Sequence, residues 1–227
     1  MTTTDLAALP PPFVFTFPGV YAPQHDTRLL MRALQDEHIA PGTRVLDLGT
    51  GSGALAIRAA QLGARVTAVD LARRAVATAR LNAWFHRRRI DVRRSDLTAA
   101  VAGRTYDLLL CNPPYVPSPD PGLPGHGAAR AWDAGSDGRL VLDRVCDGAR
   151  AALRPGGVLL LVHSGLSGTG RTLERLSRAG LRATVVHRAV VPLGPVLRSR
   201  QVWLRQQGLL APGATTEELV VIRARRP

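Results

Sequence analysis

Short apolar runs recur along the chain, and most are followed by segments whose apolar residues repeat at helical spacing. The runs are bounded by Gly, Pro and charged residues, which is typical of strands buried inside a sheet. Strands that alternate with helices predict an α/β fold with a mostly parallel sheet. The predicted strands cover residues 44–48, 65–69, 89–93, 106–111, 158–162, 182–190 and 218–222, and the predicted helices cover residues 24–38, 54–61, 72–85, 138–153 and 171–178.

The first predicted strand runs directly into a glycine-rich loop, Gly49-Thr50-Gly51-Ser52-Gly53, which precedes a helix. Glycines let the backbone approach a ligand closely, and the unpaired N–H groups at a helix N-terminus point outward toward it. The second strand ends in Asp70, where nucleotide-binding folds place an acid for ribose hydroxyls. Strand, loop and acid together predict a nucleotide-binding unit.

The loop has the spacing G-x-G-x-G and follows Asp47, so it departs from the G-x-G-x-x-G cradle for a pyrophosphate. A carboxylate beside the loop would repel phosphate, whereas it would tolerate a cationic ligand. The sequence therefore favours a nucleoside without phosphates, such as S-adenosylmethionine.

Two further polar residues follow predicted strands, Asp96 after the third and Asn112 after the fourth. Ligands of open α/β sheets bind beyond the carboxyl ends of the strands, so we expect Asp47, Asp70, Asp96 and Asn112 to gather on one rim. Asp96 could accept a hydrogen bond from an adenine amino group there, or it could simply be a turn residue.

Asn112-Pro113-Pro114-Tyr115 is a stiff segment with free carbonyls, because proline fixes φ and has no N–H donor. The Asn112 side chain adds another carbonyl, and Tyr115 adds a flat face. Such a segment suits a planar –NH2 group, whose two hydrogens need two acceptors. The alternative is an ordinary end of a strand, because Pro-Pro also terminates strands.

The amino-acid composition bears on the number of domains, on the catalytic mechanisms that are possible and on the charge of the partners. The 227 residues, 45% of them hydrophobic, predict one globular domain at residues 20–227 after an extended leader at residues 1–19. All 30 basic residues are Arg, against 17 acidic residues, which gives a net charge of +13. The lack of Lys excludes a Schiff-base or P-loop lysine, and the positive charge favours acidic partners such as RNA or the ribosome.

Cysteine and histidine usage predicts neither a disulfide nor a metal site. Cys111 and Cys146 form no C-x-x-C pair, and the six histidines lack ligand spacing. No apolar run approaches the length that spans a bilayer, so we expect a cytoplasmic protein without membrane contact.

Two segments stand outside the regular alternation. Residues 116–137 are rich in Pro and Gly and follow the N-P-P-Y segment, so we interpret them as a substrate-shaping lid rather than a mobile surface loop. Residues 195–210 could form a short basic amphipathic helix that docks a partner, but we favour a helix that covers a sheet edge.

In order and spacing, Asp47 to Gly53, Asp70, Asp96 and Asn112-Pro113-Pro114-Tyr115 resemble the motifs of class I S-adenosylmethionine-dependent methyltransferases. The N-P-P-Y form is similar to that of the HemK family, whose members methylate a glutamine side-chain amide. The resemblance runs from about residue 20 to 162, and it fades beyond Gly165. Two other segments resemble the short, single-domain branch of the HemK family. They are Tyr21-x-Pro23-x-x-Asp26-Thr27 and Trp132-x-x-Gly135-x-x-Gly138-Arg139.

The resemblance implies a Rossmann-like fold whose seven-stranded, mostly parallel sheet has one antiparallel strand and helices on both faces. It also implies S-adenosylmethionine as the cofactor, with Asp70 on the ribose and Asp96 on the adenine amine. The catalytic residues would be Asn112, Pro113, Pro114 and Tyr115. The residues expected to bind the cofactor are Tyr21, Asp26, Thr27, Asp47, Gly49, Thr50, Gly51, Gly53, Asp70, Leu71, Asp96, Leu97 and Asn112.

The resemblance further implies partners. The known target of the family is the glutamine of a G-G-Q loop in peptide-chain release factors, so we expect a protein substrate. Members of the short branch often work with a small zinc-binding activator subunit. The helical N-terminal domain with which bacterial members dock release factors has no counterpart in this sequence, and residues 195–210 are unfamiliar in the family.

Two other functions stay open. The same tetrapeptide occurs in enzymes that methylate the exocyclic amine of adenine in RNA or DNA, and the net charge of +13 suits such a substrate. No aromatic-studded basic stretch suggests strand binding, however. The third alternative is a module that binds S-adenosylmethionine without catalysis.

Overall fold

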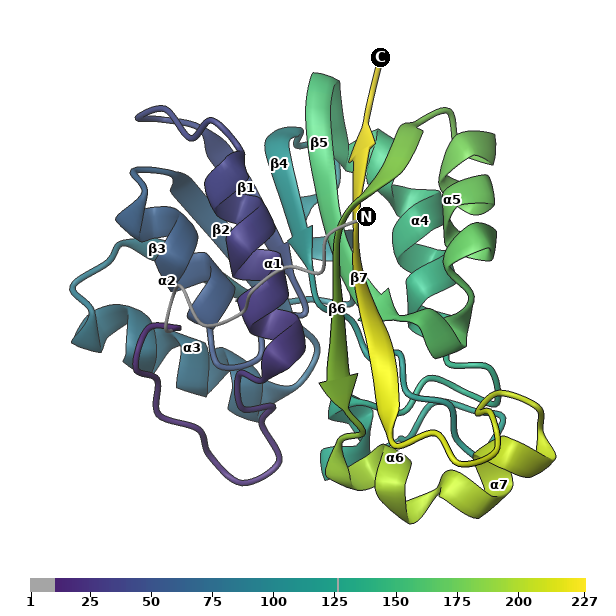
Figure 1. Ribbon diagram of the computed structural model, residues 1–227. Helices are drawn as coiled ribbons and strands as arrows, with labels where there is room; N and C mark the ends of the chain where they lie inside the picture. Colours follow the sequence, from purple (N-terminus) through teal and green to yellow (C-terminus); the bar gives the residue numbers. More distant parts are fainter. Residues whose placement is uncertain (1–10, 126) are drawn as a thin grey trace.

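The computed structural model describes residues 11–125 and 127–227, which form one sheet of seven strands (Figure 1). The strands are β1 (Arg44–Leu48), β2 (Arg65–Asp70), β3 (Ile90–Arg94), β4 (Tyr106–Cys111), β5 (Leu153–Ser164), β6 (Arg182–Pro192) and β7 (Thr216–Arg225). Their order is β3-β2-β1-β4-β5-β7-β6. β7 is antiparallel to β5 and β6, while the other pairs are parallel, so the expected sheet with one antiparallel strand is confirmed.

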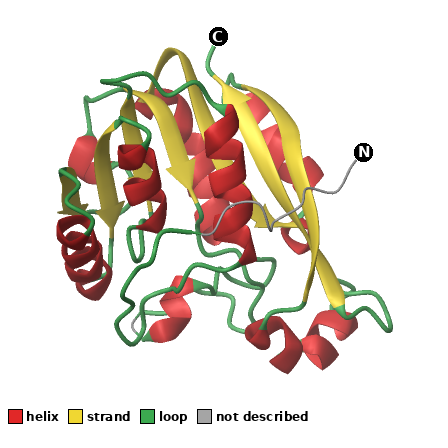
Figure 2. Ribbon diagram, turned by 60° about the vertical axis from the view of Figure 1, so that its left-hand side comes forward, coloured by secondary structure: helices red, strands yellow, loops and turns green. Residues whose placement is uncertain are grey.

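Helices cover both faces of the sheet, as expected (Figure 2). One face carries α1 (His25–Asp36), α2 (Ala54–Gln61) and α3 (Arg73–Phe85), and the other carries α4 (Leu140–Ala152) and α5 (Thr169–Arg178). The shorter elements are η1 (Ala99–Val101), η2 (Ala128–Ala131), η3 (Gly165–Ser167), α6 (Pro195–Ser199) and α7 (Gln201–Gln206). No described helix is long and apolar enough to cross a membrane.

β4 shows why the sheet needs a helix layer on each side. Leu108 and Leu110 belong to the core under α1, α2 and α3, whereas Leu109 and Cys111 belong to the core under α4 and α5. All four are at most 3% exposed. A strand that is apolar at four consecutive positions must be buried on both faces, and this fixes β4 at the centre of the sheet.

The observed elements differ from the predicted ones in detail. β5 begins at Leu153, earlier than predicted, because Leu153 pairs with Tyr106 before the register shifts to Leu108 and Val158. Strands β6 and β7 are also longer than predicted, since they pair as a hairpin from Arg182–Arg225 to Pro192–Thr216.

The prediction that residues 195–210 cover a sheet edge is wrong. They form α6 and α7 at the end of the β6–β7 hairpin, on the side toward which the β4 and β6 arrows point (Figure 1). Four leucines bury themselves there in a small separate core, together with parts of Val116 and Leu166. These buried leucines therefore face the loops that follow β4 and β5. The leucines are Leu193, Leu197, Leu204 and Leu210.

Part of the predicted leader lies outside the described residues, namely residues 1–10. The part that follows lies against α3. The Phe15 N–H donates to Asn82 Oδ1 over 2.9 Å, and Asn82 Nδ2 donates back to the Phe15 carbonyl and to the Ser52 carbonyl, each over 2.8 Å. One fully buried amide therefore ties the leader to the glycine-rich loop.

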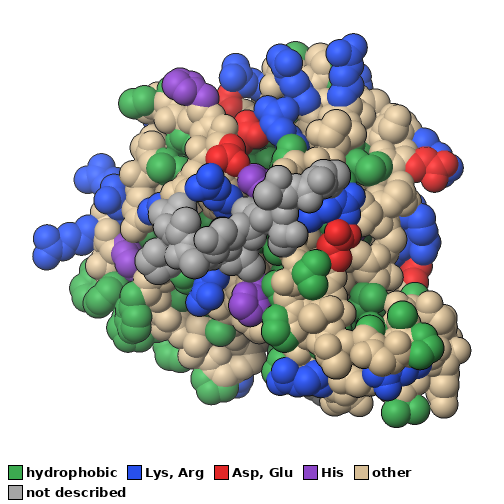
Figure 3. Space-filling view, in the orientation of Figure 1, with side chains coloured by type: hydrophobic (Ala, Val, Ile, Leu, Met, Phe, Trp, Pro, Cys, Tyr) green, Lys and Arg blue, Asp and Glu red, His purple; other side chains and the backbone are tan. Residues whose placement is uncertain are grey.

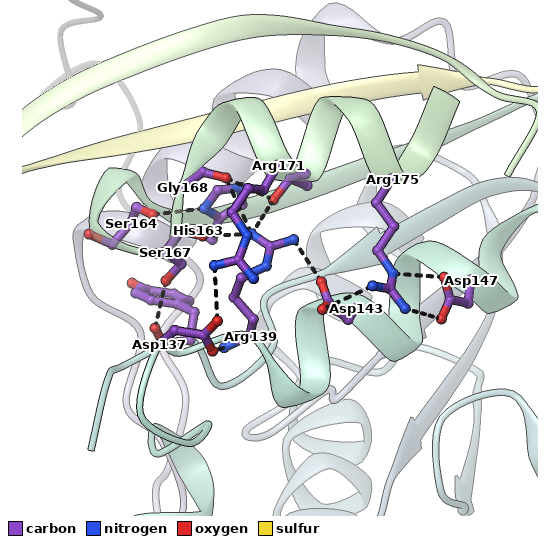
Figure 4. Close-up of polar contacts among 12 residues, drawn as sticks. Asp137, Arg139, Asp143, Asp147, His163, Ser164, Ser167, Gly168, Arg171 and Arg175 are labelled. Carbon is purple, nitrogen blue, oxygen red and sulfur yellow. Dashed lines mark hydrogen bonds and ion pairs between the residues drawn. The ribbon is translucent and has the colours of Figure 1, made fainter. Parts of the chain in front are cut away.

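A chain of ion pairs fastens α4 to α5 (Figure 4). The Arg139 side chain is 3% exposed and donates to the Ser167 carbonyl over 2.6 Å, to Thr172 Oγ1 over 3.0 Å and to Asp143 over 2.7 Å. Asp143 in turn pairs with Arg175 over 3.1 Å. Because Ser167 Oγ donates to the Tyr115 carbonyl over 2.9 Å, this network also supports the segment that follows β4.

We predict that Arg139→Ala lowers the free energy of unfolding by about 2–5 kcal/mol, because it leaves the buried Ser167 carbonyl and Thr172 Oγ1 without this donor and removes one of the two arginines that pair with Asp143. Arg171→Ala is the matched control, since Arg171 pairs with Asp137 over 3.0 Å with side chains 60% and 42% exposed. Its loss should cost no more than about 1 kcal/mol. Urea titration of both variants measures the difference, and equal losses would show that the Arg139 network contributes little.

Candidate active site

A cavity of about 230 Å³ opens beyond the carboxyl ends of β1, β2 and β4. Its wall combines the glycine-rich loop, the ends of the strands, the start of α1 and the segment after β4. Most of the predicted site residues meet there. Those that line the cavity are Tyr21, Asp26, Thr27, Gly49, Thr50, Gly51, Asp70, Leu71, Asp96, Leu97, Asn112, Pro113, Pro114 and Tyr115.

The glycine-rich loop folds back onto the end of β2. The N–H groups of Gly49 and Thr50 donate to the Val69 carbonyl over 2.9 and 3.0 Å. Gly53, which does not line the cavity, has φ +87°, and a Cβ there would lie 3.2 Å from the Ala79 backbone of α3. Gly53 thus lets α2 begin close against α3, a packing role rather than a ligand contact.

Asp70 is held in place by backbone donors. Its Oδ2 accepts from the Gly51 N–H over 3.0 Å and its Oδ1 from the Ala72 N–H over 2.8 Å. Burial raises the pKa of Asp70, while these N–H groups and the positive charge of Arg130 oppose the rise. Both oxygens keep a further lone pair, so the carboxylate can still accept from a hydroxyl in the cavity.

Asp96 is held less firmly than Asp70. Its carboxylate pairs with Arg144 of α4 over 2.8 Å, and both side chains are 47% exposed. Exposed pairs of this kind are weak, so Asp96 can exchange partners at little cost. Leu97 beside it lines the cavity, in a left-handed conformation with φ 49°.

Asp47 does not line the cavity, contrary to the predicted role in direct cofactor binding. It is fully buried behind the loop, where Oδ2 accepts from Thr50 Oγ1 over 2.6 Å and Oδ1 has no partner among the described residues. Burial raises its pKa to about 7. The carboxyl group therefore supports the loop from behind, because a strand residue that points into the core cannot also reach the rim.

Asn112 and Pro113 place two acceptors at the end of β4. Asn112 Nδ2 lies 3.4 Å from Thr27 Oγ1, which leaves the side-chain oxygen directed elsewhere. Among residues 11–125 and 127–227, no donor bonds to Asn112 Oδ1 or to the Pro113 carbonyl. Asn112 lines the cavity, and so does Pro113.

Asp26 holds two tyrosines at the same end of the cavity. Its Oδ2 accepts from the Tyr21 hydroxyl over 2.8 Å and from the Tyr115 hydroxyl over 3.0 Å. Burial and the neighbouring Asp26 raise the pKa of Tyr115 well above its usual range, so the phenol stays protonated and can donate. The cluster joins the segment before α1 to the N-P-P-Y segment.

Three further charged residues lie at the cavity or close to Asp26. Glu217 of β7 is 9% exposed, and burial together with Asp26 raises its pKa to about 7. Arg144 reaches the rim from α4, and Asp133 reaches it from the segment after η2. No local motif marks them, because each is brought to the site by tertiary contacts.

The segment predicted as a lid contributes to the wall. Leu123, Pro124, Gly127, Arg130 and Trp132 all line the cavity. Residue 126 lies outside the described residues.

The residues that line the cavity fit a nucleoside that carries a charged amino-acid end. A carboxylate at Asp70 suits vicinal hydroxyls, while Leu71, Ala75 and Leu97 offer apolar surface for a base. Two arginines line the described part of the wall, Arg130 and Arg144, and the latter is paired with Asp96. The residues present therefore fit S-adenosylmethionine better than a diphosphate.

Comparison with known proteins agrees with this chemistry. The Methyltransferase small domain family matches residues 13–120. A Methanocaldococcus jannaschii protein named "Putative protein N5-glutamine methyltransferase" is 34% identical over 176 residues, 77% of this chain and 87% of that protein. The release factor glutamine methyltransferase of Salmonella typhimurium is 36% identical over 158 residues, 66% of this chain and 57% of that protein. The chain thus spans little more than half the length of that bacterial relative.

Solved structures share the fold. The Mtq2–Trm112 complex of E. cuniculi, described as responsible for methylation of the eRF1 translation termination factor, matches with a TM-score of 0.63 and 25% identity over 92% of this chain and 99% of that chain. The T. thermophilus 16S rRNA N2 G1207 methyltransferase, solved with AdoMet and guanosine, matches with a TM-score of 0.58 and 23% identity over 93% of this chain and 46% of that chain. Given the identity and coverage of the archaeal relative, the chain belongs to the HemK family of S-adenosylmethionine-dependent protein N5-glutamine methyltransferases.

Proposed function

We propose that this protein methylates the side-chain amide nitrogen of a glutamine residue in a protein, and that the acceptor is a peptide-chain release factor. The observation that carries the proposal is the pair of acceptors at Asn112 Oδ1 and the Pro113 carbonyl, which no donor of the described residues occupies, beside a cavity that fits S-adenosylmethionine. The names of the archaeal and bacterial relatives support the choice of glutamine.

The chain's own residues would divide into a cofactor half and an acceptor half. When bound, S-adenosylmethionine supplies an electrophilic methyl group. Asp70 would accept from the ribose hydroxyls, and Asp96 would exchange Arg144 for the adenine amine between Leu71 and Leu97. The loop backbone from Gly49 to Ser52, together with Tyr21, Asp26 and Thr27, would surround the amino-acid end.

On the acceptor side, two hydrogen bonds would orient the glutamine amide. Asn112 Oδ1 and the Pro113 carbonyl would each accept a hydrogen bond from one of the two amide N–H groups. These bonds would raise the electron density on a poorly nucleophilic nitrogen and aim it into the cavity. Pro114 keeps this backbone stiff, and Tyr115 presents a ring whose hydroxyl is anchored on Asp26. Transfer would form the new N–C bond as the bond between the methyl group and the cofactor sulfur breaks. The neutral thioether S-adenosylhomocysteine would leave, and the nitrogen would lose one proton to solvent. No protein group has to form a covalent bond in such a step, so positioning would dominate the acceleration.

We further propose that residues 20–227 act as one catalytic unit with residues 1–19 as its leader. Because the chain resembles an Mtq2 solved together with Trm112, a small activator subunit is a candidate partner. The net charge of +13 would favour contact with RNA or the ribosome near a release factor.

The first prediction tests the acceptor class. Purified protein and methyl-labelled cofactor are added to cell lysate, before and after nuclease treatment. We expect label in a protein band that survives nuclease. Label that disappears with RNA or DNA would instead support the adenine amine, and no transfer to any fraction would leave a module that binds the cofactor without catalysis.

The second prediction concerns Asn112. Asn112→Ala should lower turnover by roughly 10²-fold, because it removes one of two positioning hydrogen bonds in the transition state. Calorimetry should find the cofactor affinity nearly unchanged, whereas Asp70→Asn should weaken it. If Asn112→Ala lost cofactor affinity in step with activity, the division into two halves would be wrong.

The third prediction concerns pH and Asp47. Its pKa is raised to about 7 in the folded protein, so its contribution to stability is fully present below the unfolded pKa and is lost as pH rises through 7. Asp47→Asn cannot ionise, and its melting temperature should therefore fall less than that of the wild type between pH 5 and pH 8. Glu217, whose pKa is also raised to about 7, contributes separately to the fall in melting temperature with pH, and Glu217→Gln measures that contribution. Parallel melting curves for wild type and Asp47→Asn would contradict the assignment.

A further inference from the structure

The insert between β6 and β7 touches the segment that follows the N-P-P-Y residues. Arg200 lies between α6 and α7, and its side chain is 20% exposed. Its two terminal nitrogens donate to Asp133, Nη1 to Oδ1 over 2.5 Å and Nη2 to Oδ2 over 3.0 Å, and Nη1 also donates to the Pro117 carbonyl over 3.0 Å. Such a two-pronged contact fixes geometry as well as charge.

Asp133 passes this constraint to the acceptor segment. Its side chain is 8% exposed, and it lines the cavity. Residues 132–135 run beside residues 116–118, with Val116 N–H donating to the Trp132 carbonyl over 2.8 Å, Ala134 N–H to the Val116 carbonyl over 3.1 Å and Ser118 N–H to the Gly135 carbonyl over 2.9 Å. The insert therefore holds both sides of this pairing, one through Asp133 and one through Pro117.

The other side of Tyr115 is already fixed. Ser167 Oγ donates to the Tyr115 carbonyl, and Gly138 lies so close that a Cβ there would be 2.2 Å from that carbonyl oxygen. Val116 packs in the small leucine core of the insert. The backbone at Tyr115 and Val116 is therefore held on both sides. Ser167, which follows β5, contacts it on one side, and the insert packs against it on the other.

We propose that Arg200 is a positioning residue for methyl transfer, which acts through Asp133 and Pro117 to hold the segment that presents the amide acceptors. This inference rests on the proposed function. It makes the insert part of the acceptor half of the site, and not a cover for the sheet.

In Figure 3 hydrophobic and basic side chains lie exposed over the insert at the lower right. Val202 of α7, for example, is 69% exposed.

The test compares Arg200→Ala with a matched pair elsewhere. Arg223 makes a similar two-pronged contact with Glu37, over 2.6 and 3.1 Å, between β7 and the end of α1. Arg223→Ala removes the same charge and the same kind of contact without touching the acceptor segment. With a recombinant release factor as acceptor, we expect Arg200→Ala to lower kcat at least about 10-fold, since small misplacements of reacting groups are costly. Cofactor affinity should change less than about 2-fold, and Arg223→Ala should keep kcat near wild type.

Two further variants guard against loss of folding. Arg200→Lys keeps the charge but not the two-pronged contact, and it should recover part of kcat. Asp133→Asn should lower kcat in the same direction as Arg200→Ala. Folded Arg200→Ala with wild-type kcat, or with cofactor affinity lost in proportion to activity, would overturn the proposal.

Hydrogen exchange tests the positioning role of Arg200 independently of the proposed function, because the measurement needs no methyl acceptor. Arg200→Ala should speed exchange at the amides of Val116, Ser118 and Ala134 and leave the amides of Gly49 to Gly53 unchanged. Unchanged exchange after residue 115 would refute the positioning role even if glutamine methylation holds. Faster exchange in a protein that does not methylate glutamine would refute the proposed function alone.

Discussion

The acceptor end of the site depends on one carboxylate, that of Asp26, which joins segments far apart in the sequence. It accepts hydrogen bonds from Tyr21 before α1 and from Tyr115 after β4, over 2.8 and 3.0 Å. Because Asp26 is 3% exposed, neither tyrosine has water as an easy substitute partner. The result is a fixed ring and a fixed backbone where the proposed amide acceptor would lie, while Ser167 and Arg200 hold the same segment by donating to the carbonyls of Tyr115 and Pro117.

Buried carboxyl groups give the site its electrostatic character. Burial raises the pKa of Asp47, Asp70 and Glu217, so the ionised form of each is costly in the folded protein, and of these three only Asp70 lines the cavity. A cationic ligand relieves that cost, whereas a phosphate would increase it. Asp26 and Asp70, two acids that line the cavity, therefore favour a cationic ligand over a pyrophosphate, as the spacing of the glycine-rich loop does.

Much of the fold and of the cofactor half could be predicted from the sequence, because both rest on local signals. The glycine-rich loop and the acids at strand ends need only the rule that parallel strands share a rim, and Asp70 and Asn112 lie there. Asp47 and Gly53 were misplaced, since strand alternation turns one into the core and helix packing uses the other. Glu217, Arg144 and the Arg200–Asp133 pair depend on long-range contacts, which no spacing in the sequence encodes.

The most direct test of the account asks which nitrogen receives the methyl group. A release factor labelled with 15N in its glutamine side-chain amides would be incubated with the protein and with S-adenosylmethionine that carries a 13C methyl group. The account predicts a product in which the 13C methyl is bonded to a 15N side-chain amide, seen as a one-bond coupling by NMR. A methyl group on any other atom of the acceptor, or none at all under conditions where the cofactor binds, would contradict it.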